Sequence, residues 1–352
     1  MTGSPPLLTV DGLAVELSGQ RVVSDINLSL EAGESFALLG PSGCGKTTIL
    51  RSIVGLQTIA AGSITYDGRE LANHTTGLDL APEARDIGLV FQEGAVFPHL
   101  DVASNIGFGL SHLGAQERSA RVHALLDTLG LSGKGGRASH ELSGGERQRV
   151  ALGRAIARSP RLVLLDEPFA NLDAVLRVKL RREVFQLLRD RGIASLLVTH
   201  DQDEAADVAD RMAVLDQGRL LQTGNPEDIR RRPASKAVAG FVGNSSLIEV
   251  SIESGVAQLQ SRTMPLSGER PDGHSTAVLQ PEDLALTDHE APDLMGHAVR
   301  VETLGGSPVL VVETEGLHGP ERLRVALGPT PPPDEGSPVG VRIRTPALYI
   351  LP

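Results

Sequence analysis

Largely apolar runs of strand length alternate with helix-like stripes over the first two thirds of the chain. Apolar residues three and four positions apart predict one helix over Val122–Leu129 and another over Leu176–Leu188, closed by Gly130 and Gly192. Strands that alternate with helices indicate a mostly parallel sheet covered on both faces. The apolar runs, which predict the buried strands of that sheet, are Ser35–Leu39, Ile87–Phe91, Leu162–Leu165 and Ala194–Val198.

Other segments alternate apolar and polar positions, a pattern typical of strands with one exposed face. Leu7–Glu16 and Val22–Leu30 predict two such strands, and Gly62–Gly68 adds a strand with a tight turn. A hairpin is predicted over Met212–Gln222, with its turn at Asp216–Gly218. The chain is therefore expected to open with a half-exposed sheet in addition to the parallel one.

The character of the sequence changes after about Gly243. Long helical stripes stop there, and Gly and Pro become dense between short β-like runs. The chain is therefore expected to divide into domains at residues 1–242 and 243–352. Within the second part, Ala277–Leu286 is similar to Val341–Ile350, because each has the order strand, proline, strand. This repeat predicts a small β-barrel of two similar halves, with chance similarity as the alternative.

The run Ser35–Leu39 leads into a glycine-rich loop with the spacing G-x-x-x-x-G-K-[ST], and helical spacing follows up to Gly55. Strand, loop and helix in this order bring backbone N–H groups and a positive helix end to phosphate oxygens. Lys46 would bridge the terminal phosphates, and Thr47 would ligate Mg²⁺. The residues expected to bind ATP are Gly40, Pro41, Ser42, Gly43, Cys44, Gly45, Lys46, Thr47 and Thr48.

Polar residues stand at the ends of the other predicted buried strands, which follow the phosphate-loop segment in the sequence. Asp166 can hold Mg²⁺, and Glu167 can act as the base for a water attacking the γ-phosphate. His200 can donate to the γ-phosphate, with capping of the following helix as the alternative, and Gln92 can complete or sense the metal's ligands. The predicted catalytic residues are Glu167, His200, Gln92 and Lys46, and the predicted metal ligands are Thr47, Gln92 and Asp166.

A second glycine-rich helix start lies at Leu142–Arg149 and contains Ser143, two glycines and Glu146. Such a helix N-terminus binds anions. One nucleotide offers one triphosphate, and the first loop already wraps it. The second site is therefore expected to bind the γ-phosphate held by another subunit, which predicts a head-to-tail homodimer with two ATP molecules at its interface.

Composition narrows the class of protein. The formal net charge of −11 over 352 residues argues against broad nucleic-acid binding. No apolar stretch approaches the roughly 20 residues that cross a bilayer, and Met1–Pro6 lacks the features of a signal peptide, so a cytoplasmic protein is expected. Cys44, the single cysteine, cannot form an internal disulfide, and we expect a small buried filler there instead of a redox site.

In order and spacing, several motifs together resemble the ATPase subunits of ABC transporters over about Leu7–Asn244. The resemblance implies an α/β phosphate-loop (P-loop) ATPase fold with an antiparallel β subdomain and a helical subdomain. It also implies that Glu167 is the catalytic base. The motifs are Gly40–Thr48, Gln92, Leu142–Glu146, Leu164–Pro168, Asn171-Leu172-Asp173 and His200. The residues expected to contact ATP in trans are Ser143, Gly144, Gly145, Glu146 and Asp173.

The remainder of the chain resembles the small all-β, oligonucleotide-fold-like (TOBE) regulatory domain of importer ATPases. Phe241–Asn244 and Gln280–Asp283 look like its landmarks. This resemblance implies a peripheral protein on the inner face of the cell membrane. Its implied partners are permease subunits docking near Gln92 to His99 and, indirectly, an extracytoplasmic solute-binding protein, with no nucleic acid.

Within the importer group, Phe91–Leu100 looks most like ferric-iron importers, and polyamine, sulfate or thiosulfate, and sugar import are the alternatives. A non-transport ABC ATPase of DNA repair or of the ribosome is the alternative of another class. Such proteins resemble either two linked ATPase domains or a head with a long coiled coil between the Gln92 and Ser143 regions. This chain has a single set of motifs and a short segment there.

One departure from the family concerns the base of the nucleotide. The family usually has an aromatic residue near Leu17-Ser18 that stacks on adenine, and this sequence has none there. Because stacking on an aromatic ring contributes about 1–3 kcal/mol, we predict GTP turnover within about a hundredfold of ATP turnover, measured as phosphate release at matched concentrations. A larger preference for ATP would show that another contact selects adenine.

Overall fold

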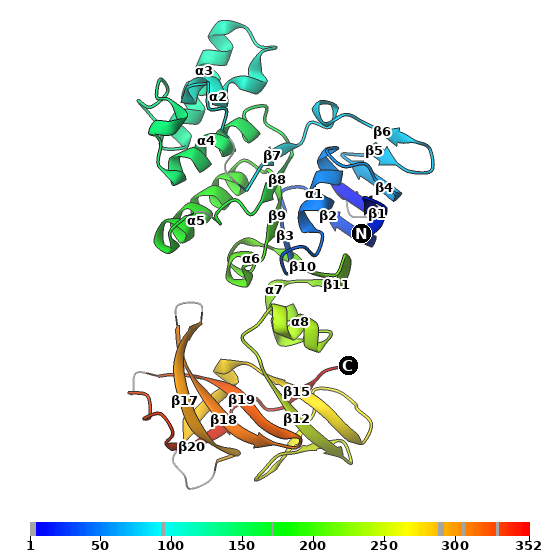
Figure 1. Ribbon diagram of the computed structural model, residues 1–352, viewed down its shortest axis with the longest axis vertical. Helices are drawn as coiled ribbons and strands as arrows, with labels where there is room; N and C mark the ends of the chain where they lie inside the picture. Colours follow the sequence, from blue (N-terminus) through cyan, green and yellow to red (C-terminus); the bar gives the residue numbers. More distant parts are fainter. Residues whose placement is uncertain (1–4, 93–95, 171, 288–291, 305–306, 329–330) are drawn as a thin grey trace. The chain divides into compact units, whose positions relative to one another are not determined.

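The computed structural model describes residues 5–92, 96–170, 172–287, 292–304, 307–328 and 331–352. The chain forms two compact units, Met1–Asn225 and Pro226–Pro352 (Figure 1). Two short helices, α7 (Pro226–Arg231) and α8 (Lys236–Phe241), belong to the second unit. The domain boundary expected between residues 242 and 243 stays a prediction.

A six-stranded sheet forms the centre of the first unit, in the order β11-β10-β3-β9-β8-β7. Its strands are β3 (Ser35–Leu39), β7 (Gly88–Val90), β8 (Leu162–Asp166), β9 (Ala194–Thr199), β10 (Arg211–Asp216) and β11 (Arg219–Gly224). All neighbours pair in parallel except β10 and β11, which form the predicted hairpin. Every residue of β3, β8 and β9 is buried, as their apolar sequences predict.

A five-stranded antiparallel sheet in the order β2-β1-β4-β5-β6 lies beside it in the same unit. Its strands are β1 (Leu8–Leu17), β2 (Gln20–Leu30), β4 (Ala61–Tyr66), β5 (Arg69–Asn73) and β6 (Leu78–Asp79). Side chains from both sheets and from α1 (Lys46–Val54) share one hydrophobic core, which includes Ile26, Ile64 and Leu164. The phosphate loop is therefore anchored to both sheets.

Helices make up the rest of the first unit: α2 (Val102–Ile106), α3 (Ala115–Thr128), α4 (Gly144–Ile156), α5 (Ala174–Asp190) and α6 (Gln202–Val208). Short 3₁₀ turns lie at η1 (Pro82–Ala84), η2 (Phe108–Leu110) and η3 (Ser139–Glu141). Helices α2, α3 and α4 pack together as the predicted helical subdomain (Figure 1). Gly130 and Gly192 follow α3 and α5 with positive φ angles of 64° and 62°, which confirms both predicted helix ends.

The second unit is all-β beyond its two short helices and a 3₁₀ turn, η4 (Pro281–Asp283), in the residues described. One sheet has the order β14-β13-β12-β15-β21 and the other β16-β20-β17-β18-β19. Both sheets contribute to one hydrophobic core. The strands are β12 (Ser246–Glu253), β13 (Val256–Gln258), β14 (Thr263–Pro265), β15 (Gly273–Leu279), β16 (Leu284–Thr287), β17 (Leu294–Leu304), β18 (Ser307–Gly316), β19 (Gly319–Ala326), β20 (Pro338–Ile343) and β21 (Tyr349–Ile350).

The internal repeat of the second unit has a structural counterpart. Ala277 of β15 is paired with Ile350 of β21, and Leu284 of β16 is paired with Ile343 of β20. The two similar segments are thus antiparallel neighbours that cross together from one sheet to the other. The two segments therefore pair with each other, and the barrel of two similar halves stays a prediction.

Arg85 was not singled out from the sequence, although its side chain is fully buried. Its Nη1 donates to the carbonyl oxygens of Ser52 (2.8 Å) and Ile53 (2.9 Å), near the end of α1. Nη2 reaches Asp79 Oδ1 at 2.6 Å. A Cβ on Gly55 would lie 2.6 Å from the Nε of Arg85, so glycine is required there. The guanidinium therefore satisfies the carbonyls of the helix that begins in the phosphate loop.

Replacing Arg85 with Met should destabilise the chain by about 3 kcal/mol or more, because buried carbonyl oxygens and Asp79 lose their donor. Urea unfolding followed by circular dichroism measures this, since the chain has no tryptophan to report by fluorescence. Arg21→Met is the matched control, because Arg21 forms an exposed ion pair with Glu16 that contributes less than about 1 kcal/mol. Equal unfolding midpoints for the two variants would contradict the buried role of Arg85.

Candidate functional site

The loop between β3 and α1 is shaped by close backbone packing. Gly43 and Gly45 have φ angles of 81° and 108°, a region that side chains with a Cβ rarely enter. A Cβ on Gly40 would lie only 2.2 Å from the carbonyl oxygen of Leu215 in β10. Gly218, in the turn of the β10–β11 hairpin, donates its N–H to the Cys44 carbonyl at 3.0 Å. The hairpin therefore supports the phosphate loop from behind.

Lys46 is the first residue of α1 and is 4% exposed. Its ammonium group donates to the carbonyl oxygens of Gly40 (2.8 Å) and Pro41 (2.9 Å), so the cation is held at the positive start of the helix. Cys44 is buried beside it, and burial raises the pKa of the thiol, as suits a small filler. The loop thus combines a lysine, backbone N–H groups and a helix N-terminus, the chemistry that binds a polyphosphate.

Thr47 and Asp166 join the phosphate loop to the end of β8. The Thr47 hydroxyl donates to Asp166 Oδ1 at 2.9 Å. Asp166 is 5% exposed; burial raises its pKa, and the hydrogen bond from Thr47 opposes that rise. Hard oxygen ligands of this kind, next to phosphate oxygens and water, suit Mg²⁺.

Three polar residues meet beyond Asp166 at the carboxyl ends of neighbouring strands. Glu167 Oε2 lies 3.1 Å from His200 Nδ1 and accepts a hydrogen bond from Gln92 Nε2 at 3.3 Å. The sequence predicted each of these residues separately, and the parallel sheet brings them together. A carboxylate between a histidine and an amide, next to the phosphate loop, can accept a proton from a water molecule.

The backbone of Glu167 is strained. Its φ angle is 42°, in the left-handed region, where a residue other than glycine costs on the order of 1 kcal/mol or more. Pro168 follows directly and restricts Glu167 further. The Glu167 N–H donates to the Val198 carbonyl in β9 at 2.9 Å, which holds the residue in place. Strain of this kind is typical of residues with a functional role.

The second glycine-rich motif begins helix α4. The Ser143 hydroxyl accepts a hydrogen bond from the Glu146 N–H, and Glu146 Oε2 accepts one from the Ser143 N–H at 2.7 Å. Asp173 caps α5 by accepting from the Leu176 N–H at 2.9 Å. These predicted residues lie at the starts of two helices and are not part of the cluster at the sheet edge. Asn171 lies outside the described residues.

The structure thus divides the predicted site residues into two groups. The phosphate loop, Asp166, Glu167, Gln92 and His200 gather at the carboxyl edge of the parallel sheet. Ser143, Gly144, Gly145, Glu146 and Asp173 lie at the starts of α4 and α5. A phosphate loop, a strand-end acid pair and a polarising histidine on this fold define a phosphate-loop nucleotide hydrolase.

Comparison with known proteins identifies its family. A family model described as ABC transporter matches residues 23–170. The sulfate/thiosulfate import ATP-binding protein CysA 2 of Chromobacterium violaceum is 42% identical over 325 residues, which cover 91% of this chain and 87% of that protein. The Fe(3+) ions import ATP-binding protein FbpC of Streptomyces coelicolor is 38% identical over 350 residues, covering 99% and 97%. The chain therefore belongs to the ABC transporter family and is an ATP-hydrolysing transport ATPase of the import type.

A solved structure agrees with the fold. The chain is similar to cbiO1 from Clostridium perfringens, part of the ABC transporter complex cbiONQ, with a TM-score of 0.59 and 28% sequence identity. The match covers 68% of this chain and 95% of that one. The predicted α/β phosphate-loop ATPase fold is thereby confirmed.

Glu146 is held as a carboxylate by its neighbours. The hydrogen bond from Lys134, followed by that from the Ser143 N–H, lowers the pKa of Glu146 from its usual value near 4.5 to about 2. A carboxylate whose pKa is lower in the folded state stabilises the protein above the unfolded-state pKa, and that contribution is lost as the pH falls through the folded-state value.

Glu146→Gln should therefore be less stable than the parent chain at pH 7, and the difference should shrink from about pH 4.5 and vanish near pH 2. Urea unfolding across this pH range measures it. In a Lys134→Met background, the same substitution should change stability much less at pH 7. A difference that is independent of pH would mean that packing, and not charge, decides the effect.

Proposed function

We propose that this chain powers solute import by closing as a homodimer over two Mg-ATP molecules and reopening on hydrolysis. The observation that carries the proposal is the meeting of Glu167, His200 and Gln92 beside the phosphate loop. ATP binds the closed dimer more tightly than the open one, and this difference in affinity is what moves the equilibrium.

Each nucleotide is held first by one chain. Backbone N–H groups of Gly40–Thr48 wrap the phosphates, and the Lys46 ammonium turns from the loop carbonyls to the β- and γ-phosphates. Thr47 and Asp166 would hold Mg²⁺, with Gln92 as a further ligand. When bound, the ion neutralises charge on the phosphate oxygens.

Hydrolysis is assigned to the residues at the strand ends. The Glu167 carboxylate accepts a proton from water as the water's oxygen attacks the γ-phosphorus. The bond between the γ-phosphorus and the bridging oxygen breaks, and the electron pair leaves with ADP. His200 donates to the γ-phosphate and keeps the carboxylate oriented, from its position 3.1 Å from Glu167 Oε2. Gln92 donates to the same carboxylate oxygen, and from there it responds to the presence of the γ-phosphate and the metal.

The second chain completes the site in this proposal. Ser143 and Gly145 contact the γ-phosphate in trans, with Gly144, Glu146 and Asp173 beside them. Two apolar residues one turn apart near the start of α5 are exposed, Val175 by 83% and Val178 by 40%. Covering this apolar pair with a second copy would be favourable, which supports a dimer contact at this position.

A permease is the proposed membrane partner, and it would dock near Gln92 to His99. The Phe97 ring lies 4.5 Å from that of Phe108, which is 57% exposed, and the Arg154 guanidinium lies 4.7 Å from the Phe97 ring centroid. Aromatic rings flanked by an arginine are typical of protein interfaces. A permease partner would place the chain on the inner face of the cell membrane. No helix in the described part of the chain has the length and hydropathy to span a membrane.

The transported solute is selected by the import system as a whole and not by this chain alone. Ferric iron is our first candidate, supported by relatives named as Fe(3+) ion importers and by the look of Phe91–Leu100. Relatives named as sulfate/thiosulfate importers give equal support to that cargo. An extracytoplasmic binding protein would deliver either solute to the permease.

Glu167→Gln tests the proposed mechanism, because the amide keeps the shape of the side chain and cannot accept the proton. The variant should bind ATP and form a stable ATP-dependent dimer by size exclusion, while turnover falls by about a hundredfold or more. Asp190→Asn, far along α5, is the matched control and should keep the parent turnover. A Glu167→Gln variant with about half of normal turnover would exclude Glu167 as the base.

The same trapped variant can identify the partners. Captured with ATP from detergent-solubilised membranes of its source, it should retain a polytopic permease. An accompanying iron-binding or sulfate-binding protein would decide the cargo. Ribosomal or DNA-repair proteins without a membrane partner would show that the chain is a non-transport ATPase.

A further inference from the structure

Glu204 is a buried acid next to the proposed hydrolytic site that the mechanism above does not use. It lies in α6 and is 5% exposed. Its Oε2 accepts a hydrogen bond from the hydroxyl of Thr199, the residue before His200. The same hydroxyl accepts from the Asp201 N–H at 3.0 Å, so Thr199 fixes the turn that carries His200. The other oxygen, Oε1, is buried without a hydrogen-bond partner in the described chain.

Arg177 in α5 has a complementary unsatisfied atom. Its Nη2 donates to the carbonyl oxygen of Leu172 at 2.9 Å, directly before Asp173. Its Nε is buried and also lacks a hydrogen-bond partner among the residues described. Burial raises the pKa of Glu204, and the positive charges of Arg181 and Arg177 act against that rise. Arg177 and Glu204 are therefore within electrostatic reach of each other.

Arg177 Nε is a hydrogen-bond donor and Glu204 Oε1 is an acceptor, and burying each without a partner destabilises the fold. A buried polar atom without a partner is unfavourable, and more so when it is charged. A single hydrogen bond from Arg177 Nε to Glu204 Oε1 would remove both costs. The hydrogen bond from Thr199 keeps one oxygen of Glu204 in place. To form the new bond, Arg177 would therefore have to move, and with it the Leu172 carbonyl to which Arg177 donates.

Leu172 in turn packs against the motif that is proposed to act in trans. A Cβ on Gly144 would lie 3.2 Å from Leu172 Cδ2, and one on Gly145 would lie 3.1 Å from Leu176 Cδ2. Because Gly144 has no Cβ, Leu172 packs close to its backbone without a clash, and a shift of Leu172 would change the packing at the start of α4. Contacts thus run from the His200 turn to Glu204 and from Arg177 to Gly144, and the bond between Arg177 and Glu204 is the link that is not formed.

We propose that Glu204 and Arg177 form a switched ion pair that couples the His200 turn to the Asp173 loop and the start of α4. The pair closes when His200 engages the γ-phosphate, and it sets the trans motif in the position that hydrolysis requires. Both are positioning residues, because neither touches ATP or the attacking water. The inference rests on the proposed function and adds residues that link its two half-sites.

Glu204→Gln and Arg177→Gln test the coupling, alone and together. Each should lower kcat for ATP by about tenfold or more with KM changed by less than about threefold, because ATP binding in cis is untouched. The double variant should be no slower than the slower single variant, since both substitutions break one link. In a Glu167→Gln background, each should also reduce the fraction of ATP-dependent dimer.

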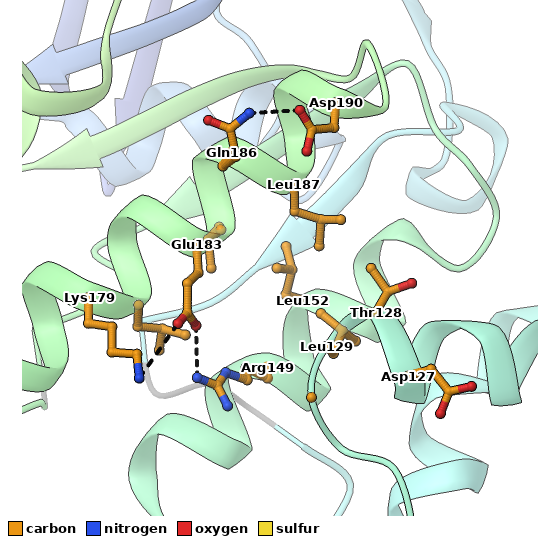
Figure 2. A pocket seen from close by; sticks show the side chains of 13 residues that line it. Asp127, Thr128, Leu129, Arg149, Leu152, Lys179, Glu183, Gln186, Leu187 and Asp190 are labelled. Carbon is orange, nitrogen blue, oxygen red and sulfur yellow. Dashed lines mark hydrogen bonds and ion pairs between the residues drawn. The ribbon is translucent and has the colours of Figure 1, made fainter.

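A surface ion pair on the same helix provides the control. Glu183 of α5 lies 2.8 Å from Arg149 and 3.9 Å from Lys179, and Figure 2 shows it at the edge of a cavity with these contacts as dashed lines. Glu183→Gln, Lys179→Gln and their combination should each keep kcat within about twofold of the parent chain. They share the helix of Arg177, so they control for effects on α5 itself.

Thr199 supplies a second test that does not depend on the folding of the Glu204 variants. Thr199→Ser keeps the hydroxyl and should retain kcat, whereas Thr199→Val removes it and should lower kcat as Glu204→Gln does. The coupling would be overturned if Thr199→Val kept the kcat of the parent chain. It would also be overturned if the losses in kcat multiplied in the Glu204/Arg177 double variant, or if the single variants raised KM at constant kcat.

The proposed function is tested separately by the parent chain and by Glu167→Gln. A parent chain without ATP turnover would refute the function itself. If the parent chain turns over ATP and Glu167→Gln abolishes that turnover, the proposed function stands. If Glu204→Gln then leaves the turnover unchanged, only the coupling is refuted.

Discussion

The hydrogen bond between Thr47 and Asp166 is the contact on which the candidate site depends. At 2.9 Å it fixes the start of α1 to the end of β8, across the intervening strand β9. The parallel sheet brings the phosphate loop and the acid pair to one edge, and this hydrogen bond ties them together there. Lys46 and Glu167 thus act from two loops that are joined by the residues next to them. The parallel order β3-β9-β8-β7 then adds His200 and Gln92 by strand position alone.

The same edge is held under steric and conformational strain. Leu215 stands where a side chain on Gly40 would lie, and Glu167 occupies a left-handed conformation. Such positions persist only when the surrounding structure over-determines them. Here the buried strands supply that rigidity, because every residue of β3, β8 and β9 is buried. A preorganised site of this kind does not have to reorganise when charge develops on the phosphate.

Local patterns were enough to predict the buried strands, the helix ends at Gly130 and Gly192, and the phosphate loop. Each of these features depends on residues that are close in sequence, so their spacing predicts the local structure directly. Arg85 could not be predicted, since its partners near Ser52 and Asp79 are brought together only by the fold. Glu204 had one weak signal, a charged residue beside the buried Ala205 and Val208 of a short helix. Burial of charge follows from tertiary contacts, which a pattern of single positions does not contain.

The start of α4 shows how a helix can cap itself and still be ready for an anion. The Ser143 oxygen accepts a hydrogen bond from the Glu146 N–H, but a hydroxyl also has a proton to donate, so capping leaves Ser143 able to contact a phosphate oxygen. The carboxylate of Glu146 would repel that phosphate if it were alone. Lys134 pairs with it and removes most of the net charge. A glutamate at this position is therefore compatible with an anion site as long as the lysine accompanies it, and the pair has to be considered as one feature of the motif.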